Sequence, residues 1–270
     1  MPTVASADGT PIAYERSGSG PALVLVDGAL CYRANGPARP LAKALEGDFT
    51  VYTYDRRGRG ESGDSRPYAV EREVEDLAAV IAAAGGEAFA FGQSSGAALA
   101  LEAADRGLRI PRLAVFEAPF LVDDGHPARP ADIAEQFDAL VAAGRRSEAV
   151  SRFLRLVGLP APFLLVMRLL PVWRKLTAVA HTLPNDFRVL GDTGSGRPLP
   201  AGRWAGATMP VLSLVGGKSP AYLHASMRAV ADVLPAAEFR VLPGQTHMLK
   251  PAAVAPVLRE FLLQASPAGR

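Results

Sequence analysis

The segment "AFAFGQSSGAALALEAA", residues 88–104, places two serines between two glycines where an apolar run gives way to alanines and leucines. The apolar run at 88–91 predicts a buried strand, and residues 95–106 predict a helix. A serine at such a junction either caps the helix or acts as a nucleophile. The surrounding sequence has to distinguish these two roles.

Strand-like and helix-like segments alternate on both sides of this junction. Strands are predicted at residues 12–15, 22–26, 49–54, 113–116, 211–215 and 238–242. Helices are predicted at residues 37–45, 70–84, 221–234 and 252–264. This alternation is typical of the α/β class, with a mostly parallel central sheet flanked by helices on both faces.

The alternation is interrupted once. Residues 122–207 carry helical patterns and many prolines and glycines, but no convincing strand. We therefore expect a core domain made of residues 1–121 and 208–270, with a helical insertion at 122–207. Such an insertion would lie above the strand ends, where open α/β sheets bind their ligands.

Composition limits the possible partners. The chain has 270 residues, is 49% hydrophobic and carries a formal net charge of +2. The small charge gives no reason to expect a nucleic-acid partner, and the pairs Arg56-Arg57 and Arg145-Arg146 are interpreted as solvated faces. Cys31 is the single cysteine, which excludes an intrachain disulfide. It is expected to be a small packing residue.

Targeting signals are not evident. The first ten residues have no basic segment followed by an apolar run, so we expect a cytoplasmic protein. The most apolar window, residues 153–170, contains two arginines and two prolines. A membrane span needs about 20 apolar residues with few charges, so this window predicts two short helices rather than a span.

Gly92-Gln93-Ser94-Ser95-Gly96 fits the G-x-S-x-G pattern of a nucleophile elbow. Around it, the chain resembles the α/β-hydrolase superfamily over nearly its whole length. The resemblance rests on four motifs in order: "LVLVDGA", "YTYDRRGRGESG", "FGQSSG" and "LPGQTHM". It implies an α/β-hydrolase fold in which residues 122–207 form a cap domain.

The resemblance also assigns site residues. It implies Ser94 as the nucleophile and His247 as the general base, because His247 follows the last predicted strand. His126, His181 and His224 lack such a position. The backbone N–H groups of Ala29 and Ser95 would form the oxyanion hole, although the sequence has Asp27-Gly28 where the family usually has His-Gly.

The acid of the triad departs from the family pattern. Ser219 stands where the family commonly has Asp, and a hydroxyl cannot compensate the charge of an imidazolium. Some members of the superfamily carry the acid at the end of the preceding strand instead, so the resemblance makes Glu117, which ends that predicted strand here, our candidate. A carboxylate at this position is also costly unless it is paired. Three alternatives stay open: Asp123 or Asp124 as the acid, a dyad without an acid, and a structural pair between Glu117 and an arginine such as Arg112 or Arg129.

Together these residues predict a serine hydrolase that cleaves an ester, thioester, lactone or amide of an apolar small molecule. No metal or cofactor is expected, and the chain is expected to be a monomer or homodimer. The expected pocket residues are Leu30, Phe163, Met167, Trp173 and Met248. Two alternatives remain: a cyclase, lyase or acyltransferase using the same serine and histidine, and a hydrolase-derived small-molecule binding protein.

Overall fold

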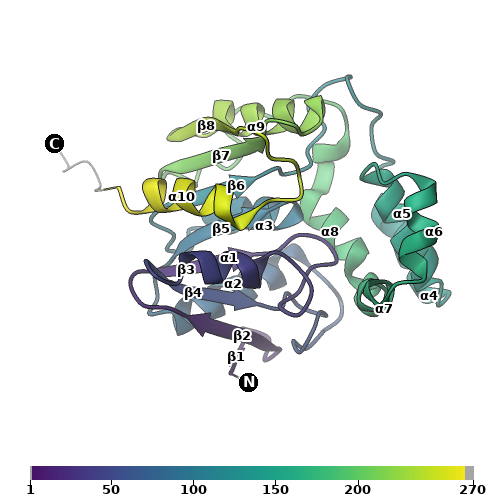
Figure 1. Ribbon diagram of the computed structural model, residues 1–270, viewed down its shortest axis with the longest axis horizontal. Coiled ribbons are helices and arrows are strands. Elements are labelled where there is room, and N and C mark those ends of the chain that lie inside the picture. Colours follow the sequence, from purple (N-terminus) through teal and green to yellow (C-terminus); the bar gives the residue numbers. More distant parts are fainter. Residues whose placement is uncertain (1, 265–270) are drawn as a thin grey trace.

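A single eight-stranded sheet forms the centre of the computed structural model, which describes residues 2–264 (Figure 1). Its strand order is β1-β2-β4-β3-β5-β6-β7-β8. The strands are β1 (Thr3–Ala5), β2 (Pro11–Ser17), β3 (Ala22–Val26), β4 (Thr50–Tyr54), β5 (Phe89–Gln93), β6 (Leu113–Phe116), β7 (Val211–Gly216) and β8 (Ala237–Leu242). Strands β3 to β8 pair in parallel, while β1 and β2 pair antiparallel at one edge.

Alternating side chains of the central strands enter two separate apolar cores. In β3, Leu23 and Leu25 face one core, and Val24 and Val26 face the other. All four are buried because the sheet is covered on both faces, which explains the continuous apolar sequence of this strand.

Two layers of helices provide this cover. Helices α1 (Ala38–Leu45) and α10 (Pro251–Leu262) pack together on one face. Helices α2 (Val70–Ala83), α3 (Ser95–Asp105) and α9 (Ala221–Val233) lie on the other face. Helix α2 ends before Gly85, whose φ of +109° is one that an L side chain rarely adopts.

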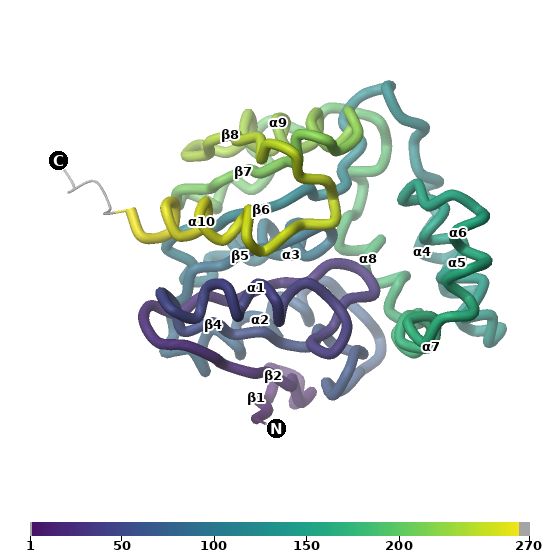
Figure 2. Tube along the Cα trace, viewed as in Figure 1, coloured from purple at the N-terminus to yellow at the C-terminus, as the bar shows by residue number. Residues whose placement is uncertain are grey.

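Between β6 and β7 the chain leaves the sheet and forms a group of helices beyond one end of the strands (Figures 1 and 2). These are α4 (Ile133–Ala142), α5 (Arg146–Leu156), α6 (Ala161–Arg168), α7 (Pro171–Ala178) and α8 (Leu183–Leu190), with 3₁₀ turns at Ala180–Thr182 and Gly191–Gly194. Helix α8 returns to the core and packs on α3. None of the helices within residues 2–264 combines the length and apolarity needed to cross a membrane.

The fold class predicted from the sequence is confirmed, and each predicted strand and helix is present with ends that differ by at most a few residues. The short edge strand β1 was not predicted. The interpretation of Arg56-Arg57 as a solvated face is wrong, because each side chain is buried with 1% exposure. Both arginines are paired with carboxylates from other elements.

Candidate active site

Ser94 occupies the sharp turn between β5 and α3. Its backbone has φ 58° and ψ −127°, a strained combination for a residue with a side chain. Small neighbours allow this turn. A Cβ on Gly96 would lie 2.2 Å from the carbonyl oxygen of Val26, and one on Gly92 would lie 2.5 Å from the carbonyl oxygen of Gly96. The geometry is that of a nucleophile elbow.

His247 lies in the loop that follows β8. Its Nδ1 atom is 2.7 Å from Oε2 of Glu117. Its ring stacks on Phe116, with ring centroids 6.4 Å apart, and its backbone carbonyl accepts a hydrogen bond of 3.2 Å from Gln93 Nε2. These contacts tie the loop to β5 and β6, the two strands that lead to Ser94 and Glu117.

Glu117 follows the last residue of β6 and is fully buried. Its φ of 49° turns the chain at the end of the strand. Oε1 accepts hydrogen bonds from the backbone N–H of Gly216 at 2.7 Å and from Ser219 Oγ at 2.5 Å. With His247 on Oε2, both oxygens of this buried carboxylate are hydrogen-bonded, as burial requires.

The arginines proposed as structural partners of Glu117 lie elsewhere. Arg112 donates to the carbonyl of Gln264, and Arg129 donates to the carbonyl of Pro119. Asp123 and Asp124 lie in an exposed loop, where Asp123 accepts a bond from the N–H of Gly125. The structure therefore brings Glu117, rather than these alternatives, to His247.

Ala29 and Ser95 follow the carboxyl ends of the neighbouring strands β3 and β5. Ala29 follows β3, and Ser95 begins α3, where the helix N-terminus adds a partial positive charge. Gly28 approaches the nucleophile so closely that a Cβ at this position would lie 2.8 Å from Ser94 Cβ. Glycine is therefore required at position 28.

A buried ionic cluster contacts both Ser95 and the loop that carries Ala29. Asp186 of α8 accepts hydrogen bonds from Ser95 Oγ at 2.7 Å, Arg56 at 2.8 Å and Arg59 at 2.8 Å. Arg56 also forms a two-point ion pair with Glu73, at 2.7 and 2.8 Å. The two guanidinium groups lower the pKa of the Asp186 carboxyl against the opposing effect of burial. Ionised carboxylates therefore match the two buried arginines.

The same arginines hold the loop after β3. Arg59 donates to the carbonyl oxygen of Gly28 at 2.6 Å and of Cys31 at 3.2 Å. Arg56 donates to the carbonyl oxygen of Asp27 at 3.3 Å. Sequence analysis missed this cluster. Arg56 and Arg59 lie in the motif "YTYDRRGRGESG", which fits the family pattern, so no signal in the sequence set these two side chains apart.

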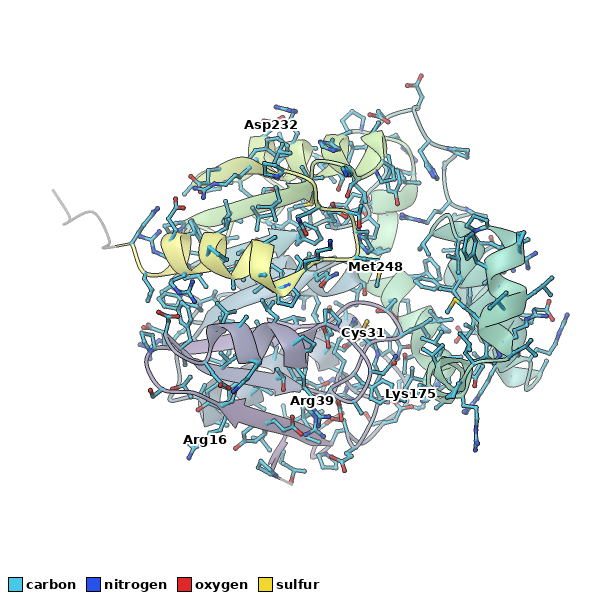
Figure 3. All side chains as sticks on the ribbon, viewed as in Figure 1. Arg16, Cys31, Arg39, Lys175, Asp232 and Met248 are labelled. Atoms are coloured by element: carbon cyan, nitrogen blue, oxygen red, sulfur yellow. The ribbon has the colours of Figure 1, made fainter. Side chains whose placement is uncertain are left out.

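The expected pocket residues differ in their surroundings. Leu30 and Trp173 are buried, and the indole N–H of Trp173 donates to Ser147 Oγ. Met167 is half-buried. Phe163 is 62% exposed and Met248, directly after His247, is 81% exposed. Figure 3 shows Met248 at the end of the sheet that faces the inserted helices. Their role in substrate binding stays a prediction.

The remaining histidines and the cysteine lie outside the β5–α3 elbow and outside the loop after β8 that carries His247. His126 contacts the ring of Tyr222, and His181 lies in the 3₁₀ turn Ala180–Thr182, where burial lowers its pKa. His224 is on α9. Burial raises the pKa of the Cys31 thiol to about 12, so the reactive thiolate is scarce near neutral pH.

A parallel sheet with a strained Ser94 elbow and a His247–Glu117 pair at its strand ends defines an α/β-fold hydrolase. Comparison with known proteins agrees. The model of the alpha/beta hydrolase family matches residues 18–257, and the chain belongs to that family.

Individual relatives support the same class. The chain is 53% identical to an alpha/beta hydrolase from Sphaerobacter thermophilus DSM 20745, with a TM-score of 0.89 over 97% of this chain and 100% of the other. A thermophilic esterase from Thermogutta terrifontis shares the fold at 23% identity and a TM-score of 0.70, over 97% of both chains. Hydrolase YraK of Bacillus subtilis, described as uncharacterized, is 32% identical over 155 residues, a match that spans about half of each chain (55%).

Proposed function

We propose that the protein is a serine hydrolase that cleaves an ester, thioester, lactone or amide of an apolar small molecule through an acyl-enzyme. The single observation that carries this proposal is the 2.7 Å contact between His247 Nδ1 and Glu117, next to the Ser94 elbow. A carboxylate at Nδ1 keeps the proton on that nitrogen and leaves Nε2 free to accept one.

The reaction follows from this arrangement. Ser94 Oγ attacks the carbonyl carbon as His247 Nε2 takes its proton. Glu117 stabilises the imidazolium that forms, and the N–H groups of Ala29 and Ser95 bind the oxyanion. His247 then protonates the leaving group. In the second half, His247 activates a water that releases the acyl group and restores the serine.

We also propose that residues 122–207 form a cap over this site, with Leu30, Phe163, Met167, Trp173 and Met248 contributing to the acyl-binding surface. An aliphatic and aromatic surface of this kind favours acyl chains of medium length over acetyl. A series of p-nitrophenyl esters from acetate to decanoate tests this. A preference for acetate would contradict the proposed lining.

The proposed mechanism has a direct test. A fluorophosphonate probe labels serines that are activated by a neighbouring base. We expect labelling at Ser94, located by peptide mass spectrometry, and loss of both labelling and p-nitrophenyl ester turnover in Ser94→Ala. Removing such a nucleophile lowers kcat by about 10⁶-fold. Retention of a tenth of the wild-type rate would exclude Ser94 as the nucleophile, and an unlabelled serine would favour the binding-protein alternative.

Product analysis distinguishes the other alternative. A hydrolase gives a free acid together with an alcohol, a thiol or an amine (a lactone gives one hydroxy acid), with one oxygen of the acid taken from water. A cyclase, lyase or acyltransferase would give a product without that oxygen. Turnover in ¹⁸O-labelled water followed by mass spectrometry of the acid separates these outcomes.

A further inference from the structure

Exposed apolar side chains are concentrated on one part of the inserted helices. Ten large apolar residues are exposed within residues 2–264, and seven of them lie between residues 156 and 170. Leu165 and Leu169 are 64% and 86% exposed. We call this region, on the end of α5, on α6 and on the turns that flank it, the α6 surface. Scattered apolar residues are normal on a protein, whereas a cluster of this kind marks an interaction site.

Helix α6 explains why the cluster is exposed. Its sequence, "APFLLVMR", is apolar around nearly the whole helix, yet Leu164 is its one fully buried residue. A helix that is apolar on all sides is normally enclosed by protein or lipid. Here one side packs on the neighbouring helices and the opposite side is open.

The chain segment that carries the α6 surface is also rich in positive charge. Residues 145–178 contain seven arginines and lysines but a single acid, Glu148, which gives a net charge of +6. The whole chain carries +2, so the remaining residues sum to −4. Arg155, Arg168, Arg174 and Lys175 are exposed, and none of the four has a carboxylate partner within the described residues (Lys175 is labelled in Figure 3).

We propose that the α6 surface binds an anionic lipid membrane from one side, without crossing it. Aliphatic side chains would enter the boundary between headgroups and acyl chains, and the basic residues would contact the lipid headgroups. A second copy of this chain fits less well. A symmetric contact through this surface would bring two segments of charge +6 together, and like charges disfavour such a contact.

Vesicle sedimentation tests this proposal on the full chain. We expect binding to vesicles of phosphatidylcholine with 30% phosphatidylglycerol, weak binding to pure phosphatidylcholine, and loss of binding in high salt. Leu165→Ser/Leu169→Ser should reduce binding at least tenfold. Arg174→Gln/Lys175→Gln should reduce it by roughly fivefold per charge removed. All four side chains are exposed, so unfolding is not expected, and circular dichroism checks this.

Matched controls lie elsewhere on the surface. Val241→Ser/Leu263→Ser removes exposed apolar groups and Arg16→Gln removes an exposed charge, and neither should change binding. Equal binding to neutral vesicles, equal losses in the controls, or no binding at all would overturn the proposal. A wild-type dimer detected by light scattering would also overturn the proposal, if the Leu165→Ser/Leu169→Ser variant is monomeric and the wild type does not bind vesicles.

A separate observation concerns Arg59, and it rests on the proposed function. The carbonyl of Gly28 and the N–H of Ala29 belong to the same planar peptide unit. Arg59 Nη1 donates a hydrogen bond of 2.6 Å to that carbonyl. Arg59 Nη2 donates two hydrogen bonds of 2.8 Å to the carboxylate of Asp186. Thr182 Oγ1 accepts from Nε at 3.1 Å. The guanidinium is therefore fixed in position.

We infer that Arg59 is a positioning residue for the oxyanion hole. A charged donor on the carbonyl orients the Gly28–Ala29 peptide plane and polarises it, because hydrogen bonds in a chain strengthen one another. Both effects make the Ala29 N–H a better donor to an oxyanion. The benefit is greatest in the transition state, where the oxygen carries most charge.

The test compares two buried arginines. We expect Arg59→Lys to lower kcat about 10- to 100-fold with KM within twofold, and to weaken a trifluoromethyl ketone inhibitor by the same factor. Arg57→Lys is the matched control, since Arg57 pairs with Asp76 and Asp8 and has no contact with the Gly28–Ala29 peptide. Equal effects in the two variants, or a change in KM alone, would overturn the inference.

Two further measurements keep the test decisive. If Arg59→Lys does not fold, Thr182→Val removes the hydroxyl that accepts from Arg59 Nε, and a smaller loss confined to kcat is expected. An unchanged kcat in that variant would count against the inference. Fluorophosphonate labelling of wild-type Ser94 is measured in parallel. An unlabelled wild type would show that the proposed function fails, whereas a labelled wild type with no Arg59 effect would show that only the positioning role fails.

Discussion

The carboxylate of Glu117 lies 2.7 Å from His247 Nδ1, although the two residues are 130 positions apart in the sequence. The sheet explains this contact. Strands β6 and β8 both pair in parallel with β7, so the carboxyl ends of all three strands lie at the same end of the sheet. The N–H of Gly216, at the end of β7, holds the second carboxylate oxygen and fixes its orientation.

Glu117→Gln should therefore lower kcat by several orders of magnitude. A triad acid replaced by its amide leaves the geometry intact but favours the wrong histidine tautomer, which costs about 10⁴-fold in a serine protease. The fold should persist, because Gln has the same shape. Steady-state kinetics with a p-nitrophenyl ester measure kcat. Asp123→Asn and Asp124→Asn serve as controls and should change it less than twofold, so a large loss in either would contradict the assignment of Glu117.

Ser219→Asp restores the residue common in the family, yet alone it should impair the enzyme. Ser219 Oγ is 2.5 Å from Glu117 Oε1, so a second carboxylate would meet the first and repel it. In a Glu117→Gln background the same change should recover part of the lost kcat, because the new carboxylate can approach His247 without that repulsion. Kinetics of the two single variants and the double variant test this. A double variant no better than Glu117→Gln would show that a carboxylate at position 219 cannot replace Glu117.

Much of the fold was predictable because local signals agreed with tertiary structure. The apolar run of β3 indicated a strand buried on both faces, and the glycines after α2 indicated the end of that helix. The choice of Glu117 as a candidate followed from the family resemblance, because some members carry the acid at this strand end, and from the presence of a carboxylate directly after a buried strand. Its contact with His247 depends on strand order, which no local pattern specifies.

The Arg56–Arg59–Asp186 cluster was not predictable in this way. Adjacent arginines are usually solvated, and their burial depends on Asp186, 130 residues beyond Arg56 in a separate helix. Net charge was misleading for a similar reason. A total of +2 conceals a segment of +6, and the exposed large apolar residues are concentrated in the same segment.

Asp27→Asn should change how stability depends on pH. Burial raises the pKa of the Asp27 carboxyl from an ordinary 3.8 to about 7. Between about pH 4 and 7 the unfolded chain therefore loses this proton while the folded chain keeps it, so the contribution of Asp27 to the unfolding free energy should fall as pH rises. Asparagine carries no such charge. The unfolding free energy of the variant minus that of the wild type, measured by urea denaturation, should increase by roughly 1–3 kcal/mol between pH 5 and pH 8. A difference that stays constant with pH would show that Asp27 does not titrate in this range.

Asp186→Asn should be among the most destabilising single changes of a carboxylate in this protein. The side chain is buried, and its ionised form compensates Arg56 and Arg59, which stay charged and buried in the variant. Removing one partner of a buried ion pair typically costs about 3–5 kcal/mol. Arg56 keeps its pair with Glu73, whereas Arg59 loses its carboxylate partner and stays buried. Asp192→Asn is the matched control, because Asp192 forms a partly exposed pair with Arg203 and should cost at most about 1 kcal/mol. Urea denaturation of both variants at pH 7 measures the two losses. If they are equal, the cluster is either hydrated or rearranged in solution, and it cannot hold the loop after β3 in the way described.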